Sequence, residues 1–330
     1  MNREQYAAML KDISETHKAG GDTAACIAKY NERYKFMYIY NDNVFKILFG
    51  SPENEKITID FLNAVLGFIG SDCINNLAYI NPALPDAFGK SITSDIVATD
   101  QRLDRIVLEV QHIEDDSYNA RLVLYTAKHT IASRIKGEDY ALQNLNLISL
   151  QMFDGFPNSP NYRHSIRFKN QENEEFYDKQ TITLVEIPKF LKGNFATDNS
   201  RIAQWLRVID GLNNETPVAV PEGSPFALLQ EKAQLSIFTE EFLVSEAMKM
   251  SDHKYELYVE KKHARKEGLE EGRAEGRAEG RAEGLTEGAD AKAREMAAAM
   301  LADGDSVEKV VRISKLPESD VLAIKACLQK

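Results

Sequence analysis

The chain has 330 residues, of which 43% are hydrophobic and 28% are charged, enough for about two domains with a sizeable buried core. Its formal net charge of −11 argues against a protein that binds nucleic acid over its whole surface, because non-specific affinity depends on clustered Lys and Arg. Any binding of nucleic acid must therefore come from a local basic patch.

The N-terminus and the cysteines indicate the cellular compartment. The first residues, MNREQYAAMLKDISETHKAG, are polar and helix-like and lack the apolar run of a signal peptide. No segment predicts a membrane span. Because Cys26, Cys73 and Cys327 are scattered singly, we expect a reduced, cytoplasmic protein.

The first predicted elements are helices. Residues 3–34 read as one or two of them. In the segment ITIDFLNAVL, apolar residues recur at helical spacing, and Ser51 followed by Pro52 supplies an N-cap and a proline at the first helical position. A helix over about residues 52–66 is therefore predicted.

A β-hairpin is predicted after the proline-containing stretch NPALPDAFGK. The segments SITSDIVATD and DRIVLEVQHI read as two strands joined by a turn around residues 101–103. Glu109 and Gln111 share one face of the second strand because they are two residues apart. With this turn, the numbers of paired residues sum to about 203 or 204, which places Asp95 opposite Leu108 or Glu109.

Asp95 and Glu109 are candidate metal ligands. Two carboxylates side by side repel each other, and their burial is costly unless a divalent cation lies between them. Oxygen ligands of this kind suit Mg²⁺ or Mn²⁺. Acidic residues on strands often face only water, so the pattern gains its meaning from the rest of the chain.

A long amphipathic helix is predicted next, from YNARLVLYTAKHTIASRIK to a stop at Gly137. Between Arg121 and Lys136 it carries basic residues and no acid. Arg121, Tyr125 and Lys128 lie at positions i, i+4 and i+7, on one face. Cations and a tyrosine beside a metal site would suit contact with a phosphate backbone. The alternative is that Tyr125 packs in the core and the cations are merely solvated.

The rest of the body reads as β structure. LNLISLQMFD is an almost continuous apolar run and predicts a buried strand. The segment HSIRFKNQENEEFYDKQTITLVEIPKF then predicts a hairpin with a polar turn at NQEN. Together these elements predict a mixed α/β body.

A repeat separates this body from the C-terminal part. Six glycines recur at four-residue spacing from Gly268 to Gly288, each preceded by glutamate. On a helix, the Gly and Ala stripes would let two copies approach closely. Each glycine costs about 1 kcal/mol of helix stability relative to alanine, so a solvated, partly frayed linker is the alternative to a self-associating spacer.

The C-terminal part predicts three short helices. Gly304 closes the first, Asp305 or Ser306 starts the second, and Pro317 opens the third. The outline resembles a helix-turn-helix, but the third helix begins with acidic residues that would repel phosphates. Packing or oligomerisation is therefore the preferred interpretation.

Seven short motifs occur in a diagnostic order: FKILFG, IDFLNAVLG, SDIVATD, LEVQ, RLVLYTAKH, KGEDY and VEIPKF. In this order they resemble the Rpn family of recombination-promoting nucleases and putative transposases, a branch of the PD-(D/E)XK superfamily, over about residues 36–290. The repeat-containing tail is also similar to that family. The resemblance implies an α/β fold with a restriction-endonuclease-like core, a mixed sheet flanked by helices, and a helical C-terminal tail.

The resemblance also implies Mg²⁺-dependent hydrolysis of DNA, with Mn²⁺ as the other candidate metal, in recombination, mobile-element or defence biology. Its catalytic positions fall on Asp95, Glu109 and Gln111. A third acid often comes from the first core helix. Asp60 is our candidate for it, and Glu53 and the neutral Asn63 stay open as alternatives.

Two residues depart from the superfamily pattern. Ser94 replaces the proline that precedes the aspartate. This change is minor, because the proline only fixes the local backbone. Gln111 replaces the usual lysine, which would supply a cation beside the scissile phosphate, whereas glutamine offers a neutral hydrogen bond. Glutamine is also familiar in this branch. The alternatives to a nuclease are an inactive nuclease-fold protein that binds a partner, and a scaffold that only oligomerises.

These interpretations divide the chain into five segments. We expect a helical extension at 1–34, a nuclease-like core at 35–215, a helical segment at 216–266, the EGRA-type repeat at 267–290 and a small helical unit at 291–330. DNA is the expected partner of Arg121, Tyr125 and Lys128. The repeat and the C-terminal unit are expected to join copies of the chain into a homo-oligomer.

Overall fold

A computed structural model gives the fold of two compact units, Met1–Met250 and Ser251–Lys330. It describes residues 1–81, 83–84, 92–112, 114, 117–135, 137, 140–193, 195–250 and 291–328, with the single residues 265, 273 and 288. The predicted EGRA-type repeat therefore lies outside the described residues, apart from Arg273 and Gly288. Most of the stretch NPALPDAFGK also lies outside them.

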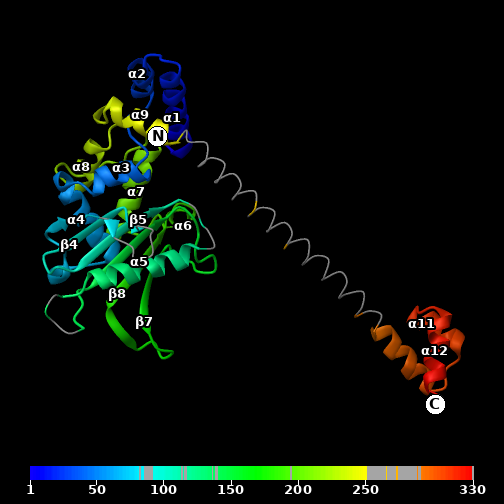
Figure 1. The fold of residues 1–330 in the computed structure, drawn as a ribbon. Helices are drawn as coiled ribbons and strands as arrows, with labels where there is room; N and C mark the ends of the chain where they lie inside the picture. Colours follow the sequence, from blue (N-terminus) through cyan, green and yellow to red (C-terminus); the bar gives the residue numbers. More distant parts are fainter. Residues whose placement is uncertain are drawn as a thin grey trace. The chain divides into compact units, whose positions relative to one another are not determined.

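The first unit is built on a six-stranded mixed sheet in the order β1-β4-β5-β6-β8-β7 (Figure 1). Its strands are β1 (Leu77–Tyr79), β4 (Ile96–Asp100), β5 (Arg105–Gln111), β6 (Leu145–Gln151), β7 (Arg163–Lys169) and β8 (Glu175–Glu186). The central strands β5, β6 and β8 are parallel, and the remaining pairings are antiparallel. A separate pair joins β2 (Ala83–Leu84) to β3 (Ile92–Thr93).

Helices cover both faces of this sheet (Figure 1). The helix α5 (Tyr118–Ala132) lies along one face. On the other side are α3 (Asp42–Phe49), α4 (Glu55–Leu66), α7 (Arg201–Asn213) and α8 (Pro225–Lys232). The helices α1 (Arg3–Lys18), α2 (Thr23–Arg33) and α9 (Glu240–Met250) pack against one another farther from the sheet (Figure 1). Shorter elements are η1 (Pro52–Asn54), η2 (Gly70–Asp72), α6 (Ile187–Lys192) and η3 (Leu235–Ile237). The mixed sheet flanked by helices confirms the predicted fold class.

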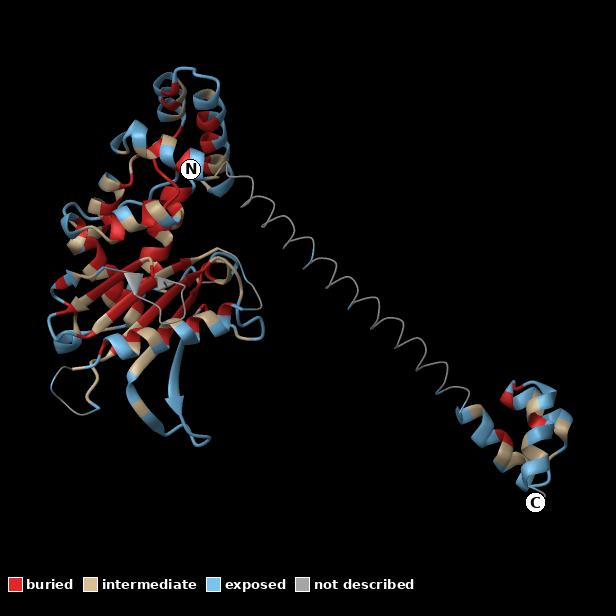
Figure 2. Cartoon of the chain, in the orientation of Figure 1, coloured by how far each residue is buried: buried red, intermediate tan, exposed pale blue. Residues whose placement is uncertain are grey.

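Two apolar cores hold these layers together. The larger one joins the sheet to α3, α4 and α7, and it buries Trp205 against Phe61, whose ring centroids lie 5.6 Å apart. The smaller one lies under α5, where Leu122 packs with Val107 and Leu147. Figure 2 shows the buried residues concentrated in the sheet and the helices that cover it, while much of the β7–β8 arm is exposed.

The predicted helix at 52–66 is observed with one difference. Pro52 begins the 3-10 turn η1, and α4 continues to Leu66, where Gly67 ends it in the left-handed region at φ 75°. Ser51 occupies the predicted cap position, but its side chain makes no capping hydrogen bond. Of the two predicted start signals, Pro52 is in place, whereas the Ser51 side chain does not cap the turn.

The helix α5 ends earlier than predicted, at Ala132 instead of Gly137. Directly after it the chain folds back, and Arg134 and Leu142 form an isolated antiparallel bridge. Gly137 does adopt a positive φ of 87°, but it lies in the turn of this loop. The helix stops early because backbone groups after Ser133 bond across the loop instead of continuing the helix.

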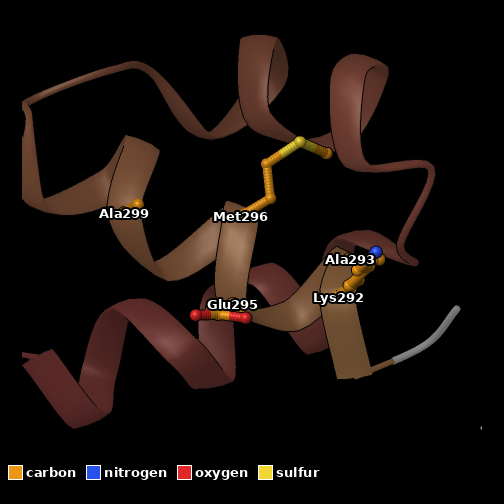
Figure 3. A pocket seen from close by; sticks show the side chains of 5 residues that line it. All are labelled: Lys292, Ala293, Glu295, Met296 and Ala299. Carbon is orange, nitrogen blue, oxygen red and sulfur yellow. The ribbon is translucent and has the colours of Figure 1, made fainter. Parts of the chain in front are cut away.

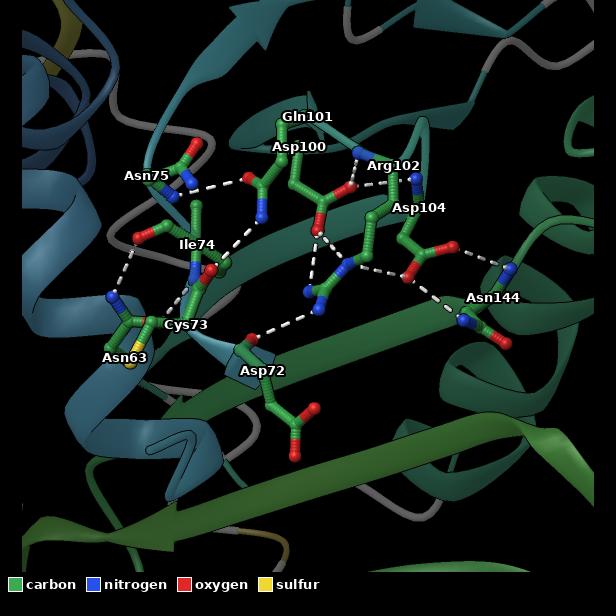
Figure 4. Close-up of polar contacts among 10 residues, drawn as sticks. All are labelled: Asn63, Asp72, Cys73, Ile74, Asn75, Asp100, Gln101, Arg102, Asp104 and Asn144. Carbon is green, nitrogen blue, oxygen red and sulfur yellow. Dashed lines mark hydrogen bonds and ion pairs between the residues drawn. The ribbon is translucent and has the colours of Figure 1, made fainter. Parts of the chain in front are cut away.

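Polar contacts fix the turn that joins β4 to β5 (Figure 4). The Asp100 carboxylate accepts hydrogen bonds from the backbone N–H of Arg102 at 2.8 Å and of Asp104 at 2.9 Å. The guanidinium of Arg102 lies 2.7 Å from Asp100 Oδ2. Leu103 adopts the left-handed region at φ 66°. Asn144 donates to Asp104 at 2.8 Å, so the turn is also tied to the residue that precedes β6.

The second unit contains the three predicted short helices. Residues 291–302 are helical, and α11 (Val307–Ser314) and α12 (Glu318–Leu328) follow. Gly304 takes φ 89°, and the Ser306 side chain caps α11. Ala297, Val310, Leu316 and Val321 form a small core. Lys292, Ala293, Glu295, Met296 and Ala299 line a surface hollow of about 570 Å³ (Figure 3).

None of the described helices is long and apolar enough to cross a bilayer.

Candidate active site

The candidate site lies where β4 begins and β5 ends. Ile96 pairs with Leu108, so the register sums to 204 and Asp95, just before β4, faces Glu109. This is one of the two registers predicted. Asp95 Oδ2 accepts a hydrogen bond from the backbone N–H of Val110 at 2.8 Å. The hydrogen bond holds the Asp95 carboxylate beside β5.

Glu109 lies on the face of the sheet that α5 covers. Val107 packs with α5, whereas Ile106 and Leu108 belong to the larger core on the opposite face. Because side chains alternate along a strand, Glu109 and Gln111 share the face of Val107. The Glu109 side chain therefore lies on the side of β5 that faces α5.

The two carboxyl groups are held in a way that disfavours their charged forms. Burial and then the negative charge of Asp95 raise the pKa of Glu109 to about 8. Burial also raises the pKa of Asp95, although the Val110 N–H and Lys46 oppose this shift. Within the described part of the chain, the buried Oε1 atom of Glu109 has no hydrogen-bond partner. A divalent cation would offset both the burial and the repulsion, so this donor set fits Mg²⁺ or Mn²⁺.

A lysine from α3 reaches the same pair. Lys46 Nζ lies 3.0 Å from Asp95 Oδ1. Burial disfavours the ammonium, but Asp95 and, more weakly, Asp42 and Glu109 outweigh it and raise the pKa of Lys46. Sequence reasoning missed Lys46 as a site residue. The motif FKILFG contains it, but no local pattern connects it to the hairpin.

Ser94, which stands where the superfamily has proline, connects the site to α5. It is fully buried, and its Oγ lies 3.0 Å from Nε2 of His129. Burial, and then the charge of Arg105, lower the pKa of His129 to about 4, so the ring is neutral at pH 7. A contact with Ser94 lowers the pKa of Glu109, as expected for a hydroxyl that donates to the carboxylate.

The direction of these hydrogen bonds follows from the arginine. Arg105 Nη1 lies 3.4 Å from His129 Nδ1, and a guanidinium can only donate. Nδ1 is then the acceptor, so Nε2 carries the ring proton and donates a hydrogen bond to Ser94 Oγ. The Ser94 hydroxyl proton is thereby directed to Glu109. A proline at this position could make neither contact.

The three predicted DNA-binding residues lie on one partly buried side of α5. Burial, and then the charge of Glu109, raise the pKa of Tyr125; Asp95 adds to this shift and Arg121 opposes it. Tyr125 is thus within electrostatic range of both carboxylates, and Arg121 is within range of Tyr125. The Nζ atom of Lys128 is buried. The three residues share one side of α5, and Tyr125 is the one whose electrostatic contact with the candidate site is shown.

Asp60 makes different contacts. Its Oδ1 accepts from Trp205 Nε1 at 2.7 Å, and both of its oxygens accept from Arg201 at 2.9 Å. Among the residues that the structure describes, no three His, Cys, Asp or Glu side chains form a group that could hold a metal. Asp60 thus links α4 to α7, and Asp95 and Glu109 are the two carboxylates that meet at the candidate site.

The alternatives to Asp60 do not complete the site either. Asn63 accepts from the backbone N–H of Ile74 at 2.8 Å and donates to the Ile74 carbonyl at 2.9 Å (Figure 4). Glu53 is exposed on η1. Asn63 therefore anchors the connection to β1 rather than a metal.

Polar side chains extend the site along the carboxyl ends of the parallel strands. Gln111 pairs with Gln151, and Gln151 pairs with Glu186. The hydroxyl of Tyr118 lies 2.6 Å from Ser149 Oγ and accepts from Gln151 Nε2 at 3.0 Å. Sequence reasoning missed this row because its members are scattered in apolar runs and align only through the parallel register.

A protein-family model described as PD-(D/E)XK nuclease family transposase matches residues 39–271. No curated protein matches the chain, and no solved structure does. The family match covers most of the first unit, including both candidate metal ligands, and it confirms the resemblance drawn from the seven motifs. The chain therefore belongs to the PD-(D/E)XK nuclease family of transposases.

Proposed function

We propose that the chain is a metal-dependent DNA endonuclease that hydrolyses phosphodiester bonds, in recombination, mobile-element or defence biology. Family membership supports a nuclease-type function. The observation that carries the metal dependence is the juxtaposition of Asp95 and Glu109, both with raised pKa values, at the meeting point of β4 and β5. Strongly perturbed carboxyls of this kind are typical of functional sites.

Asp95 and Glu109 would hold Mg²⁺ or Mn²⁺. When bound, such a cation polarises the phosphate and lowers the pKa of the attacking water. The protein prepares its own ligands for this task. The Val110 N–H orients Asp95, and the Ser94 hydroxyl favours the anionic form of Glu109.

Arg121, Tyr125 and Lys128 are proposed to contact the DNA backbone. They share one side of α5, and the electrostatic contact of Tyr125 with Glu109 and Asp95 supports a path for the strand to be cut along this side. The net charge of −11 supports a narrow contact of this kind over a broad basic surface. Contacts to phosphate position the substrate but carry no sequence information.

The test is incubation of the protein with supercoiled and linear DNA in Mg²⁺, Mn²⁺ or EDTA. We expect cleavage with either metal, none in EDTA, and none by Asp95→Ala. Glu172→Ala is the matched control, because it removes an exposed carboxylate at the tip of the β7–β8 arm. The proposal fails if the wild-type protein leaves both forms of DNA intact in both metals.

The second candidate is a weak or inactive nuclease-fold protein that acts as an oligomeric partner-binding module. Gln111 in place of the superfamily lysine favours it, as does the acidic net charge. Truncation after about Lys266 should then leave the first unit folded but lower its oligomeric state. Light scattering of the full and truncated chains, with circular dichroism for folding, decides this point. The same number of subunits in the full and truncated proteins would reject the oligomeric role of the tail.

A further inference from the structure

The nuclease motif of this chain has a neutral side chain where the superfamily has a cation. Gln111 can donate a hydrogen bond, but it carries no charge to offset the negative charge that builds on a phosphate during hydrolysis. A cation that performs this task must lie beside Asp95 and Glu109. It must also be held there before the substrate arrives, because preorganised charge costs no reorganisation during the reaction.

Lys46 meets the first requirement by its contacts. Its Nζ lies 3.0 Å from Asp95 Oδ1, and Glu109 also acts on its charge. The Lys46 side chain is 37% exposed, whereas that of Asp95 is 13% exposed. Lys46 is therefore the more exposed member of this ion pair, so a phosphate can approach it from solvent.

The helix α3 meets the second requirement. Asn41 caps its start by accepting from the backbone N–H of Asn43 and of Val44, each at 3.1 Å. Phe45 and Phe49 are fully buried and stack with ring centroids 4.4 Å apart. A helix that is capped and anchored in the core fixes the backbone from which the lysine side chain extends.

We propose that Lys46 replaces the missing motif lysine: it pairs with Asp95 in the free protein and contacts a non-bridging oxygen of the scissile phosphate when DNA is bound. This inference rests on the proposed nuclease function. It gives α3 a catalytic role and explains how a motif with Gln111 retains a cation at the site.

The experiment is a charge swap between positions 46 and 111. Three variants are compared with the wild-type protein at saturating Mg²⁺: Lys46→Gln, Gln111→Lys, and the two combined. We expect Lys46→Gln to slow cleavage by about 100-fold or more, the loss typical when one preorganised electrostatic contact is removed. The combined variant should return to within about tenfold of the wild-type rate. Lys56→Gln is the matched control, because Lys56 is exposed on α4.

A binding measurement separates contact with phosphate from a structural role. Fluorescence anisotropy of a labelled DNA duplex over a range of salt concentrations gives the slope of log K against log salt. Loss of one phosphate contact reduces the magnitude of this slope by about 0.9. We expect this reduction in Lys46→Gln and its recovery in the combined variant. Circular dichroism should show the same fold for all variants.

The outcomes distinguish the role of Lys46 from the nuclease function on which that role rests. If the wild-type protein cleaves DNA and Lys46→Gln cleaves equally fast, the role of Lys46 is overturned and the nuclease function stands. A combined variant as slow as Lys46→Gln also overturns it. If the wild-type protein cleaves nothing, the nuclease function is rejected, and an unchanged salt slope in Lys46→Gln then overturns the phosphate contact as well.

Discussion

The two ends of the β4–β5 hairpin each carry acidic side chains. Hydrogen bonds and cations offset the negative charge of these side chains to different degrees. At the turn, Asp100 receives two backbone hydrogen bonds and the guanidinium of Arg102. At the opposite end, Asp95 has one backbone hydrogen bond and Lys46, and burial raises its pKa. Glu109 beside it retains a buried Oε1 atom without a partner in the described residues.

This difference separates acids that stabilise the fold from acids prepared for a ligand. A buried carboxylate that is fully hydrogen-bonded lowers the free energy of the folded state relative to the same group left unsatisfied. A pair that is buried and mutually repulsive raises the free energy of the folded state until a cation binds. The acidic residue at the turn therefore stabilises the folded hairpin, whereas the carboxyl pair at the other end destabilises it in the absence of a cation.

The largest expected effect is the loss of cleavage in Asp95→Asn. Removal of this ligand should lower the initial rate on supercoiled DNA in Mg²⁺ by about a thousandfold, the scale of losing an essential electrostatic group. Because the substitution also relieves repulsion of Glu109, the midpoint of urea denaturation should stay close to that of the wild-type protein. A variant that loses activity only because it unfolds would contradict the comparison.

The turn should respond in the opposite way. Asp100→Ala leaves two backbone N–H groups without their acceptor and removes one of the partners of Arg102. We expect the free energy of unfolding to fall by about 3 kcal/mol, measured by urea denaturation. Asp72→Ala is the control, because Asp72 is exposed and contacts Arg102 through its backbone carbonyl. Equal stability of Asp100→Ala and the control would remove the proposed contrast.

Glu109 should make the stability of the protein depend on pH. Its pKa of about 8 in the folded protein lies above the ordinary value of 4.5, so the folded state binds a proton that the unfolded state has released. The free energy of unfolding should therefore fall as pH rises from about 4.5 to 8, by at most about 1.4 kcal/mol per pH unit.

Urea denaturation in EDTA at several pH values checks this expectation. Glu109→Gln should remove the contribution, so the stability difference between variant and wild type should grow in favour of the variant as pH rises. Addition of Mg²⁺ should flatten the wild-type curve by favouring the anion. Two parallel curves in EDTA would show that Glu109 is not the group that titrates.

Local patterns predicted the hairpin, because strand alternation and turn chemistry act between neighbours in the sequence. They left two registers open. The choice between them depends on how Asp100 and the left-handed Leu103 close the turn. The prediction that Gly137 adopts a left-handed backbone conformation is also correct. The helix nevertheless ended before it, because Arg134 and Leu142 bridge across the loop.

Long-range contacts could not be predicted in this way. Lys46 reaches Asp95 only because α3 packs into the larger core. Gln111, Gln151 and Glu186 align because three parallel strands share a register, and such strands are joined by long connections that carry no register signal. Asp60 illustrates the same limit, since its helical position suggested the site, whereas its contacts in the structure are with Arg201 and Trp205.

We expect a smaller effect from Ser94, which partly offsets the burial of the Glu109 carboxylate. Ser94→Ala removes the acceptor of the buried His129 Nε2–H and the hydroxyl that favours the Glu109 anion. An unsatisfied buried donor costs about 1–2 kcal/mol, which urea denaturation should detect. Because the Glu109 carboxylate loses a stabilising contact, the pH midpoint of Mg²⁺-dependent cleavage should also move upward. Ser51→Ala is the control, since the Ser51 side chain makes no capping bond. If stability falls but the pH midpoint stays in place, Ser94 supports His129 without acting on Glu109, and the link between α5 and the carboxylates is broken at that step.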